Sequence, residues 1–369
     1  MAELFDYLEW RGDLTFLQDP LNQVDGLIFA ALSYADFSDV VCEDFQTPIS
    51  LEEAACRMRM TQDPSKRVRV KNDLRLLEAA ADTARFSGVR MLYYRSEFLP
   101  QQQSQFAAVT FLLPEGTAVL SFRGTDDTLV GWKEDFNMSF QSRVPAQEKA
   151  LYYTEAFAAV HPNPLVLCGH SKGGNLAVYA AAQCRSSLQE RILRIYNYDG
   201  PGFAPAMMQD FGYREIVPKI STFIPESSII GMLLEHEEPV QVVRSRQVSL
   251  MQHELYSWEV QGPRLCKAPQ LDREAWHLSL AIKQWLAQRS LQERNEFVDA
   301  VYELLTAGAV EKTKELILPK NVLGYLKTIG GDEQLKGLIR SELGAFLQAV
   351  RSVRREREAP GLEEGREES

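Results

Sequence analysis

The stretch LVLCGHSKGGNLAVYAAA, residues 165–182, decides the fold. Its apolar start is typical of a buried strand, and its alanine-rich end is typical of a helix. Between them, Gly169, Ser171 and Gly173 form the GxSxG pattern of a nucleophile elbow, a sharp strand-to-helix turn that exposes a serine hydroxyl above the sheet edge. Glycines leave room for such a turn. The pattern therefore predicts Ser171 as a nucleophile.

The segments around this turn alternate between strand and helix patterns. We expect a helix at 147–160 and strands at 89–99, 106–113, 118–123, 165–168, 192–198, 219–224 and 240–245. Such alternation is typical of a mostly parallel sheet with helices on both faces. Together with the elbow, it predicts the α/β class and an α/β-hydrolase fold.

Helical patterns flank this predicted core of residues 89–271. Residues 1–88 are expected to form an N-terminal helical segment that packs on the core, with amphipathic stretches at 25–37 and 74–86. Residues 272–369 are expected to form a C-terminal helical extension with a charged tail from about Arg351. Breaks are expected near Gly308, Pro319, Gly330 and Gly331. The amphipathic extension suits a partner protein or a homo-oligomer.

Composition excludes several functional classes. The 369 residues carry a net charge of -11 and no basic stripe, so we expect no nucleic-acid partner. The acidic start does not resemble a signal peptide, and no apolar run approaches the roughly 18 residues of a transmembrane segment. We expect a cytoplasmic protein with free thiols. The few histidines show no ligand spacing, so neither a metal nor a cofactor is expected.

A serine hydroxyl is a weak nucleophile and needs a base, which in turn needs an acid to orient it. In α/β-hydrolases the chain order is serine, acid, histidine. His253 follows the predicted strand at 240–245, where this fold delivers its histidine. His236 lies among glutamates on what is predicted to be a solvated helix end, and His277 lies in the extension. His253 is therefore the predicted base.

Two residues compete for the role of the acid. Glu226, in FIPESSIIG, follows the predicted strand at 219–224, in the loop where this fold usually supplies the acid. Asp199, in YDGPGF, follows the preceding strand, and its alternative interpretation is an Asp-Gly turn or a helix cap. We expect Glu226 first, although the chain order permits both.

An oxyanion hole needs two hydrogen-bond donors about 3 Å from the developing charge. Lys172, directly after the nucleophile, supplies one backbone donor in this fold. Thr125, in SFRGTDDT after a predicted strand, is the second candidate. The Lys172 side chain either attracts anionic esters or points into solvent.

Several segments together resemble a known family. They are SFRGTDDTLVGWKEDF, CGHSKGGNLA, NYDGPGF, PESSIIG and QHELYSW, with DYLEWRGDLTF and LSYADF near the start. They resemble a bacterial lipase-like α/β-hydrolase family, a domain of unknown function related to the class 3 lipases, over most of the chain. The resemblance implies Thr125 as an oxyanion donor, a lid over residues 132–140, and His253 as the histidine. It also implies a structural turn at DGPGF, which favours Glu226, although those lipases carry an aspartate in that role.

These observations predict a serine hydrolase that cleaves carboxylic esters, small-molecule or lipid, through a Ser-His-acid triad and an acyl-enzyme. Ser171, His253 and either Glu226 or Asp199 would form the triad. One alternative is a catalytically silent binding or scaffold protein that keeps the fold. Another is a thioesterase or peptidase that uses the same triad.

Overall fold

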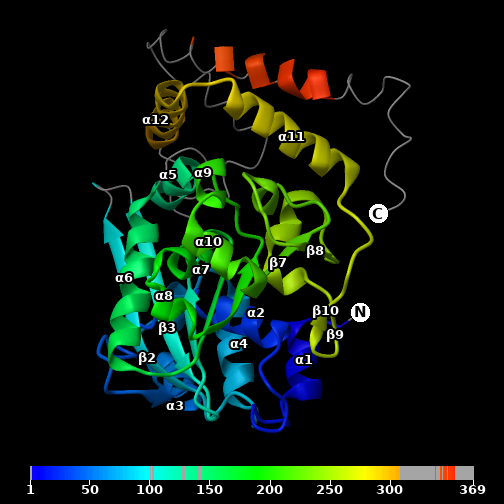
Figure 1. Ribbon diagram of the computed structural model, residues 1–369. Coiled ribbons are helices and arrows are strands. Elements are labelled where there is room, and N and C mark those ends of the chain that lie inside the picture. Colours follow the sequence, from blue (N-terminus) through cyan, green and yellow to red (C-terminus); the bar gives the residue numbers. More distant parts are fainter. Residues whose placement is uncertain are drawn as a thin grey trace. The chain divides into compact units, whose positions relative to one another are not determined.

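The computed structural model divides the chain into two compact units, Met1–Leu271 and Asp272–Ser369 (Figure 1). The structure describes residues 2–99, 101, 104–126, 129–138, 143–307, 337, 341, 342, 344–346 and 348–353. Within these ranges, every helix is too short or too polar to span a bilayer.

A sheet of eight strands organises the described part of the first unit, and its strands lie side by side in chain order. They are β1 (Ile49–Ser50), β2 (Arg90–Leu99), β3 (Ser104–Leu112), β4 (Ala118–Phe122), β5 (Leu165–His170), β6 (Ile192–Tyr198), β7 (Ile220–Pro225) and β8 (Val240–Val243). The pairs from β4 to β8 are parallel, and those from β1 to β4 are antiparallel. The predicted α/β-hydrolase fold is confirmed. A short hairpin, β9 (Val260–Gln261) and β10 (Arg264–Leu265), follows the sheet.

The helices that connect the parallel strands cover one face of this sheet. They are α5 (Leu129–Met138), α6 (Pro145–Val160), α7 (Lys172–Gln183), α8 (Ser186–Gln189), α9 (Pro205–Met208) and α10 (Phe211–Ile216). Leu120, Leu167 and Ile195 from the strands share a buried cluster with Phe157 of α6 and Leu176 of α7. Right-handed crossovers between parallel strands that advance in one direction all lie on the same face. The opposite face therefore needs another cover.

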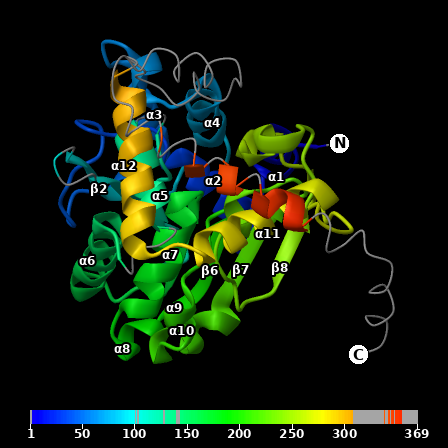
Figure 2. The same cartoon turned by 90° about the horizontal axis from the view of Figure 1, so that it is seen from above.

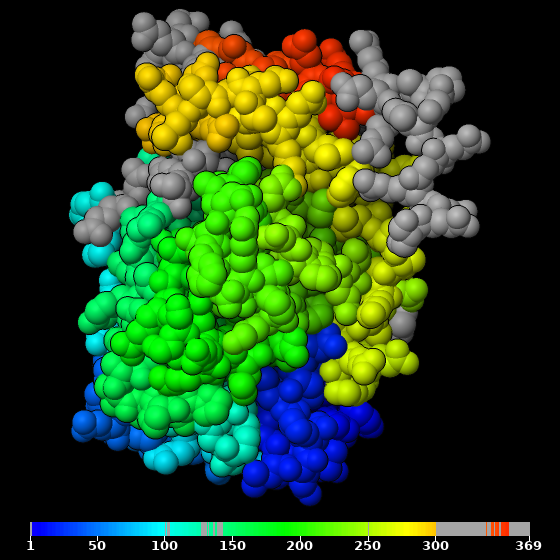
Figure 3. Space-filling model, in the orientation of Figure 1, coloured from blue at the N-terminus to red at the C-terminus, as the bar shows by residue number. Residues whose placement is uncertain are grey.

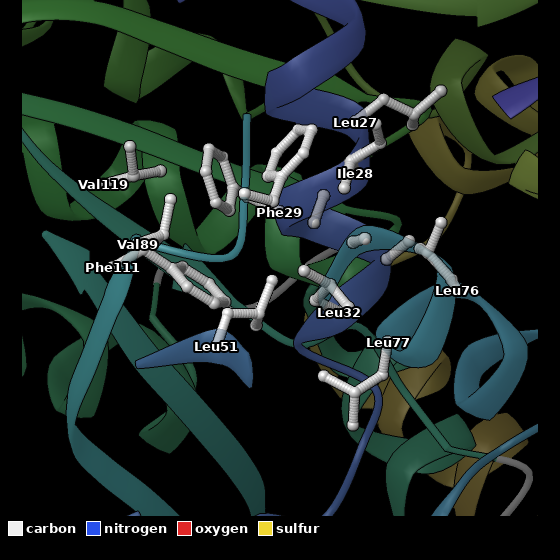
Figure 4. Close-up of a cluster of buried hydrophobic side chains, with 14 of the residues drawn as sticks. Leu27, Ile28, Phe29, Leu32, Leu51, Leu76, Leu77, Val89, Phe111 and Val119 are labelled. Atoms are coloured by element: carbon white, nitrogen blue, oxygen red, sulfur yellow. The ribbon is translucent and has the colours of Figure 1, made fainter. Parts of the chain in front are cut away.

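The N-terminal segment provides that cover. Its helices are α1 (Leu4–Arg11), α2 (Gln23–Leu32), α3 (Leu51–Arg59) and α4 (Lys71–Ala81). Phe29 of α2 packs against Phe111 of β3 with ring centroids 4.7 Å apart, and Val119 of β4 joins the same buried cluster (Figure 4). Seen from above, the sheet lies between this group of helices and the connecting helices (Figure 2). In the space-filling view the blue N-terminal residues directly adjoin the green core (Figure 3).

The second unit has a small core of its own. Its described helices include α11 (Arg273–Ala287) and α12 (Leu291–Ala307), in the predicted extension. Trp285 packs with Phe297 of α12 and with Phe346, at ring-centroid distances of 5.2 and 6.3 Å. The breaks expected near Gly308, Pro319, Gly330 and Gly331, and most of the expected charged tail, lie outside the described residues.

A buried ion pair ties the N-terminal helices together. Arg85, just after α4, donates from Nη2 to Asp25 Oδ2 of α2 at 2.6 Å, and both side chains are fully buried. The Tyr7 hydroxyl of α1 donates to Asp25 Oδ1 at 2.8 Å. Two helices and the segment that follows α4 thus meet at one carboxylate.

Arg85→Met should strip this carboxylate of its cation. An uncompensated buried charge costs about 3–5 kcal/mol, so we expect the free energy of unfolding to fall by that amount. Arg143→Met, which breaks the exposed pair with Glu148, should cost less than about 1 kcal/mol. Urea unfolding of both variants measures the difference. Equal losses would contradict a central role for Asp25 and Arg85.

Candidate active site

Ser171 occupies a strained turn between β5 and α7. Its backbone has φ 57° and ψ −130°, which a non-glycine residue rarely adopts. A Cβ atom on Gly169 would lie 2.2 Å from the carbonyl carbon of Gly173. One on Gly173 would lie 2.0 Å from the carbonyl oxygen of Phe122. The two glycines of the motif are therefore required by the close approach of strand and helix.

Asp199 and His253 meet beside this turn. Asp199 directly follows β6, and the Ser171 N–H donates to the carbonyl of the preceding Tyr198 at 2.8 Å. His253 ends a 3-10 helix, Ser249–His253, in the connection after β8. The distance between His253 Nδ1 and Asp199 Oδ2 is 2.6 Å. The Asp199 carboxylate is fully buried, and only an Nδ1–H can donate to it when it is ionised. Nε2 is then the ring atom that can accept a proton.

The loop that was expected to supply the acid supports Asp199 instead. Ser228 Oγ donates to Asp199 Oδ1, and the Gly231 N–H donates to Ser228 Oγ at 2.9 Å. Glu226, in the same loop, is half-buried. Among the described contacts, the carboxylate that hydrogen-bonds to His253 is that of Asp199. Asp199 has a positive φ of 54°, which Asp tolerates better than most residues, so this backbone geometry and its contact with the histidine coexist.

The other two downstream histidines lie elsewhere. His236 was expected on a solvated helix end, and this was wrong, because its side chain is only 11% exposed and it lies in the connection between the 3-10 helix Ile230–Met232 and β8. Its Nδ1 is 2.9 Å from Glu238 Oε1, and its Nε2 is 2.8 Å from the Gly231 carbonyl. Burial alone would raise the pKa of Glu238, but the hydrogen bond and charge of His236 and the hydrogen bond from Thr222 together outweigh burial and lower the pKa to about 2. His277 lies in α11 of the second unit.

Thr125 is oriented by a neighbouring carboxylate. Its hydroxyl donates to Asp135 Oδ1 of α5 at 2.6 Å. Burial raises the pKa of Asp135 to about 6, although Lys172 and Thr125 act in the opposite direction. The Thr125 hydroxyl is thus held by one partner instead of rotating freely.

The Lys172 side chain takes neither of its expected positions. It is 1% exposed, so it does not point into solvent, and its charge is already paired inside the protein. Its Nζ donates to Glu134 Oε2 at 2.8 Å and to the Gln105 carbonyl at 2.9 Å. Attraction of an anionic ester by this ammonium is therefore not supported. The backbone of Lys172 starts α7, where first-turn amides lack partners within the helix.

This ion pair also anchors the described part of the expected lid. Glu134 lies on α5 and accepts from the backbone N–H groups of Gln105 and Ala146 at 3.0 and 3.1 Å. Residues 139 and 140 of the expected lid lie outside the described residues. A lid over 132–140 stays a prediction, and any movement of α5 would have to break these contacts.

His170 is a site residue that the sequence did not reveal. Its ring lies against that of His253, with centroids 4.5 Å apart. Its Nε2 is 2.8 Å from the carbonyl oxygen of His253, and its Nδ1 is 2.8 Å from the Tyr34 hydroxyl. Burial holds the pKa of His170 well below its ordinary value. No spacing rule could link Tyr34 to a residue so distant in the chain.

A metal has no evident place in the described ranges, where no group of three or more His, Cys, Asp or Glu residues is arranged to hold one.

Ser171, Asp199 and His253 follow β5, β6 and β8, at the edge where α/β sheets bind their ligands.

Comparison with known proteins gives one family and several distant structures. Residues 80–303 match the family model described as Mbeg1-like. A mutant form of MDLA from Penicillium cyclopium is 16% identical, with a TM-score of 0.38 over 66% of this chain and 84% of that one. A fungal lipase structure is 13% identical, with a TM-score of 0.39 over 66% and 83%. The M37 lipase is 15% identical, with a TM-score of 0.37 over 57% and 69%. No curated protein sequence matches the chain.

Lys172→Met should leave Glu134 buried without its cation. We expect the free energy of unfolding to fall by about 3–5 kcal/mol, because an unpaired buried charge is costly. Adding Glu134→Gln to the same chain should recover much of this loss, since the charge is then gone. Urea unfolding of both single variants and the double variant measures the coupling. Strictly additive losses would show that the two residues do not act as a pair.

Proposed function

The chain belongs to the Mbeg1-like family, and from this membership and the site geometry we propose a serine hydrolase that cleaves carboxylic esters, lipid esters among them. Family membership agrees with the resemblance to lipase-like α/β-hydrolases, while a bacterial origin stays a prediction. The observation that carries the proposal is the 2.6 Å contact between His253 and the buried Asp199, beside a serine on a strained elbow.

In the proposed reaction, Ser171 Oγ attacks the carbonyl carbon of the ester while His253 Nε2 takes the serine proton. Asp199 accepts the hydrogen bond from Nδ1–H and stabilises the imidazolium that forms. The imidazolium then gives its proton to the leaving alcohol oxygen as the ester C–O bond breaks. A water molecule, activated by the same histidine, attacks the acyl-enzyme and releases the acid and the serine.

Two donors would stabilise the negative charge on the carbonyl oxygen. The first is the backbone amide of Lys172 at the start of α7, where the helix dipole adds a favourable field. The second is the backbone N–H of Thr125, because the side-chain hydroxyl of this residue already donates its one proton to Asp135 at 2.6 Å and holds the residue in place. Such preorganised donors are worth more than mobile ones because they need no reorientation during the reaction.

Asp199 is the acid of the proposed triad. Its burial and its hydrogen bond from Ser228 hold the carboxylate in one orientation. Glu226 is left out because no contact with His253 favours it. A silent scaffold protein draws its sequence support from the uncertain acid and from the long C-terminal helical extension, and the contact between Asp199 and His253 weakens the first of these. A thioesterase or peptidase would use the same residues and differs only in the leaving group.

Labelling by a fluorophosphonate probe tests whether Ser171 is reactive. Wild-type protein should be labelled and should hydrolyse chromogenic esters, whereas Ser171→Ala and His253→Ala should lose both properties while remaining folded. Ser186→Ala, a change at an exposed serine on α8, is the matched control and should behave as wild type. Folded wild-type protein that takes up no probe would favour the scaffold alternative.

A second comparison separates the two acids. Asp199→Asn should lower kcat by roughly 10⁴-fold, as loss of the orienting carboxylate does in other serine triads. Glu226→Gln is a matched change of a carboxylate to an amide and should leave kcat within about twofold, because surface substitutions outside the machinery act weakly. Steady-state hydrolysis of a short-chain ester measures both. The reverse order of effects would assign the acid to Glu226.

A further inference from the structure

A hydrogen bond from the last residue of β5 holds the main chain of His253. Because the carbonyl oxygen of His253 can only accept, the His170 ring donates to it from Nε2–H at 2.8 Å. A neutral ring that carries its proton on Nε2 can only accept at Nδ1, so the Tyr34 hydroxyl is the donor in the second contact, also 2.8 Å. The His253 carbonyl therefore fixes the His170 proton on Nε2, and the Tyr34 hydroxyl donates to the remaining acceptor nitrogen and holds the ring in this orientation.

Arg69 holds the next residue in the same loop. Its guanidinium donates from both Nη atoms to Glu254, with two contacts of 2.9 Å. Such bidentate pairs fix geometry better than single contacts do. Arg69 also lies over the Tyr34 ring, 4.5 Å from its centroid. One cluster in the N-terminal segment thus reaches both His253 and Glu254.

The segment that carries His253 depends on contacts from neighbouring elements. Its 3-10 helix, Ser249–His253, is short, and such helices have poor hydrogen-bond geometry of their own. Val248 and Met251 are 73% and 56% exposed, so apolar burial contributes little there. On the inner side, Trp258 Nε1 donates to the Gln252 carbonyl at 2.8 Å. The Ser227 N–H also donates to Gln252 Oε1 at 2.7 Å. On the other side of His253, Arg69 contacts Glu254, and Tyr34 acts through His170.

We propose that Tyr34 and Arg69 are positioning residues that hold the His253 loop in register with Ser171. His170 transmits the constraint, since it directly precedes the nucleophile and bonds to the main chain of the base. The inference rests on the proposed function. It makes the N-terminal segment, which lies mostly before the matched residues 80–303, a working part of the active centre.

Ionisation of the cluster agrees with this arrangement. Burial lowers the pKa of His170 and raises the pKa of the Tyr34 hydroxyl, so the ring stays neutral and the hydroxyl keeps its proton. The groups that face them are Arg69, Glu254, Asp73 and His253. The hydrogen-bond directions therefore hold across the neutral pH range.

Tyr34→Phe is the decisive variant, because it removes one hydroxyl and leaves the ring. We expect kcat and the rate of fluorophosphonate labelling to fall about 10-fold or more with KM within about twofold, since a slightly misplaced base slows chemistry more than binding. We also expect several-fold faster deuterium uptake in residues 249–258, because the loop opens more readily. Glu254→Gln, which weakens the bond to Arg69, should change both quantities in the same direction and provides a second variant if Tyr34→Phe does not fold.

Tyr7→Phe is the matched control. It removes another buried hydroxyl of the N-terminal segment, one that bonds to Asp25 and not to the loop. It should lower stability while leaving labelling and the uptake of residues 249–258 as in wild type. Wild-type labelling and uptake in both Tyr34→Phe and Glu254→Gln would overturn the proposal, and so would equal effects of Tyr7→Phe. If wild-type protein is not labelled, the proposed hydrolase function fails, and deuterium uptake alone decides whether the cluster holds the loop.

Discussion

The close approach of β5 and α7 at Gly169 and Gly173 is the constraint on which the site depends. A side chain at Gly169 would overlap the backbone of Gly173, and one at Gly173 would overlap the backbone of Phe122 at the end of β4, while Ser171 between them has a positive φ of 57°. This turn places the serine at the end of β5, next to β6, whose end carries Asp199. It also places His170 directly beneath the main chain of His253. The strained backbone of Ser171 is thus held by its hydrogen bond to Tyr198 and by the contact of the adjacent His170 with His253.

The order of the strands explains the second layer of the molecule. Because the parallel strands advance in one direction, their connecting helices cover one face, and the N-terminal helices have to cover the other. Tyr34 directly follows α2 and contacts His170, and Arg69 precedes α4 and contacts Glu254 in the loop that carries His253. Packing of the sheet and placement of the proposed base are therefore two results of the same arrangement. A substitution in the N-terminal segment can therefore alter the position of His253 even if the substituted residue does not contact a substrate.

Local patterns in the sequence predicted much of this structure. The strand expected at 192–198 has the same bounds as β6, and the elbow lies where its motif placed it. His253 was identified because it follows a predicted strand. Helix α2 was expected over 25–37 but ends at Leu32, because amphipathic periodicity continues into the buried turn that follows.

What the sequence could not predict depends on contacts between distant residues. Asp199 was ranked below Glu226 because a turn signal explained it sufficiently, and only the fold shows that its carboxylate faces His253. The burial of Lys172 follows from Glu134, a residue whose helix α5 was expected only as part of a lid. Tyr34 and His170 are 136 positions apart in the sequence, so no local pattern or spacing rule could predict their contact.

Peptide mapping of fluorophosphonate-treated protein tests the central claim most directly. Tryptic cleavage after Lys149 and Lys172 yields residues 150–172, in which Ser171 is the sole serine. Our account predicts one adduct per chain, located on that residue by fragmentation of this peptide. An adduct on another serine, or unmodified peptide from folded protein after exhaustive treatment, would contradict it.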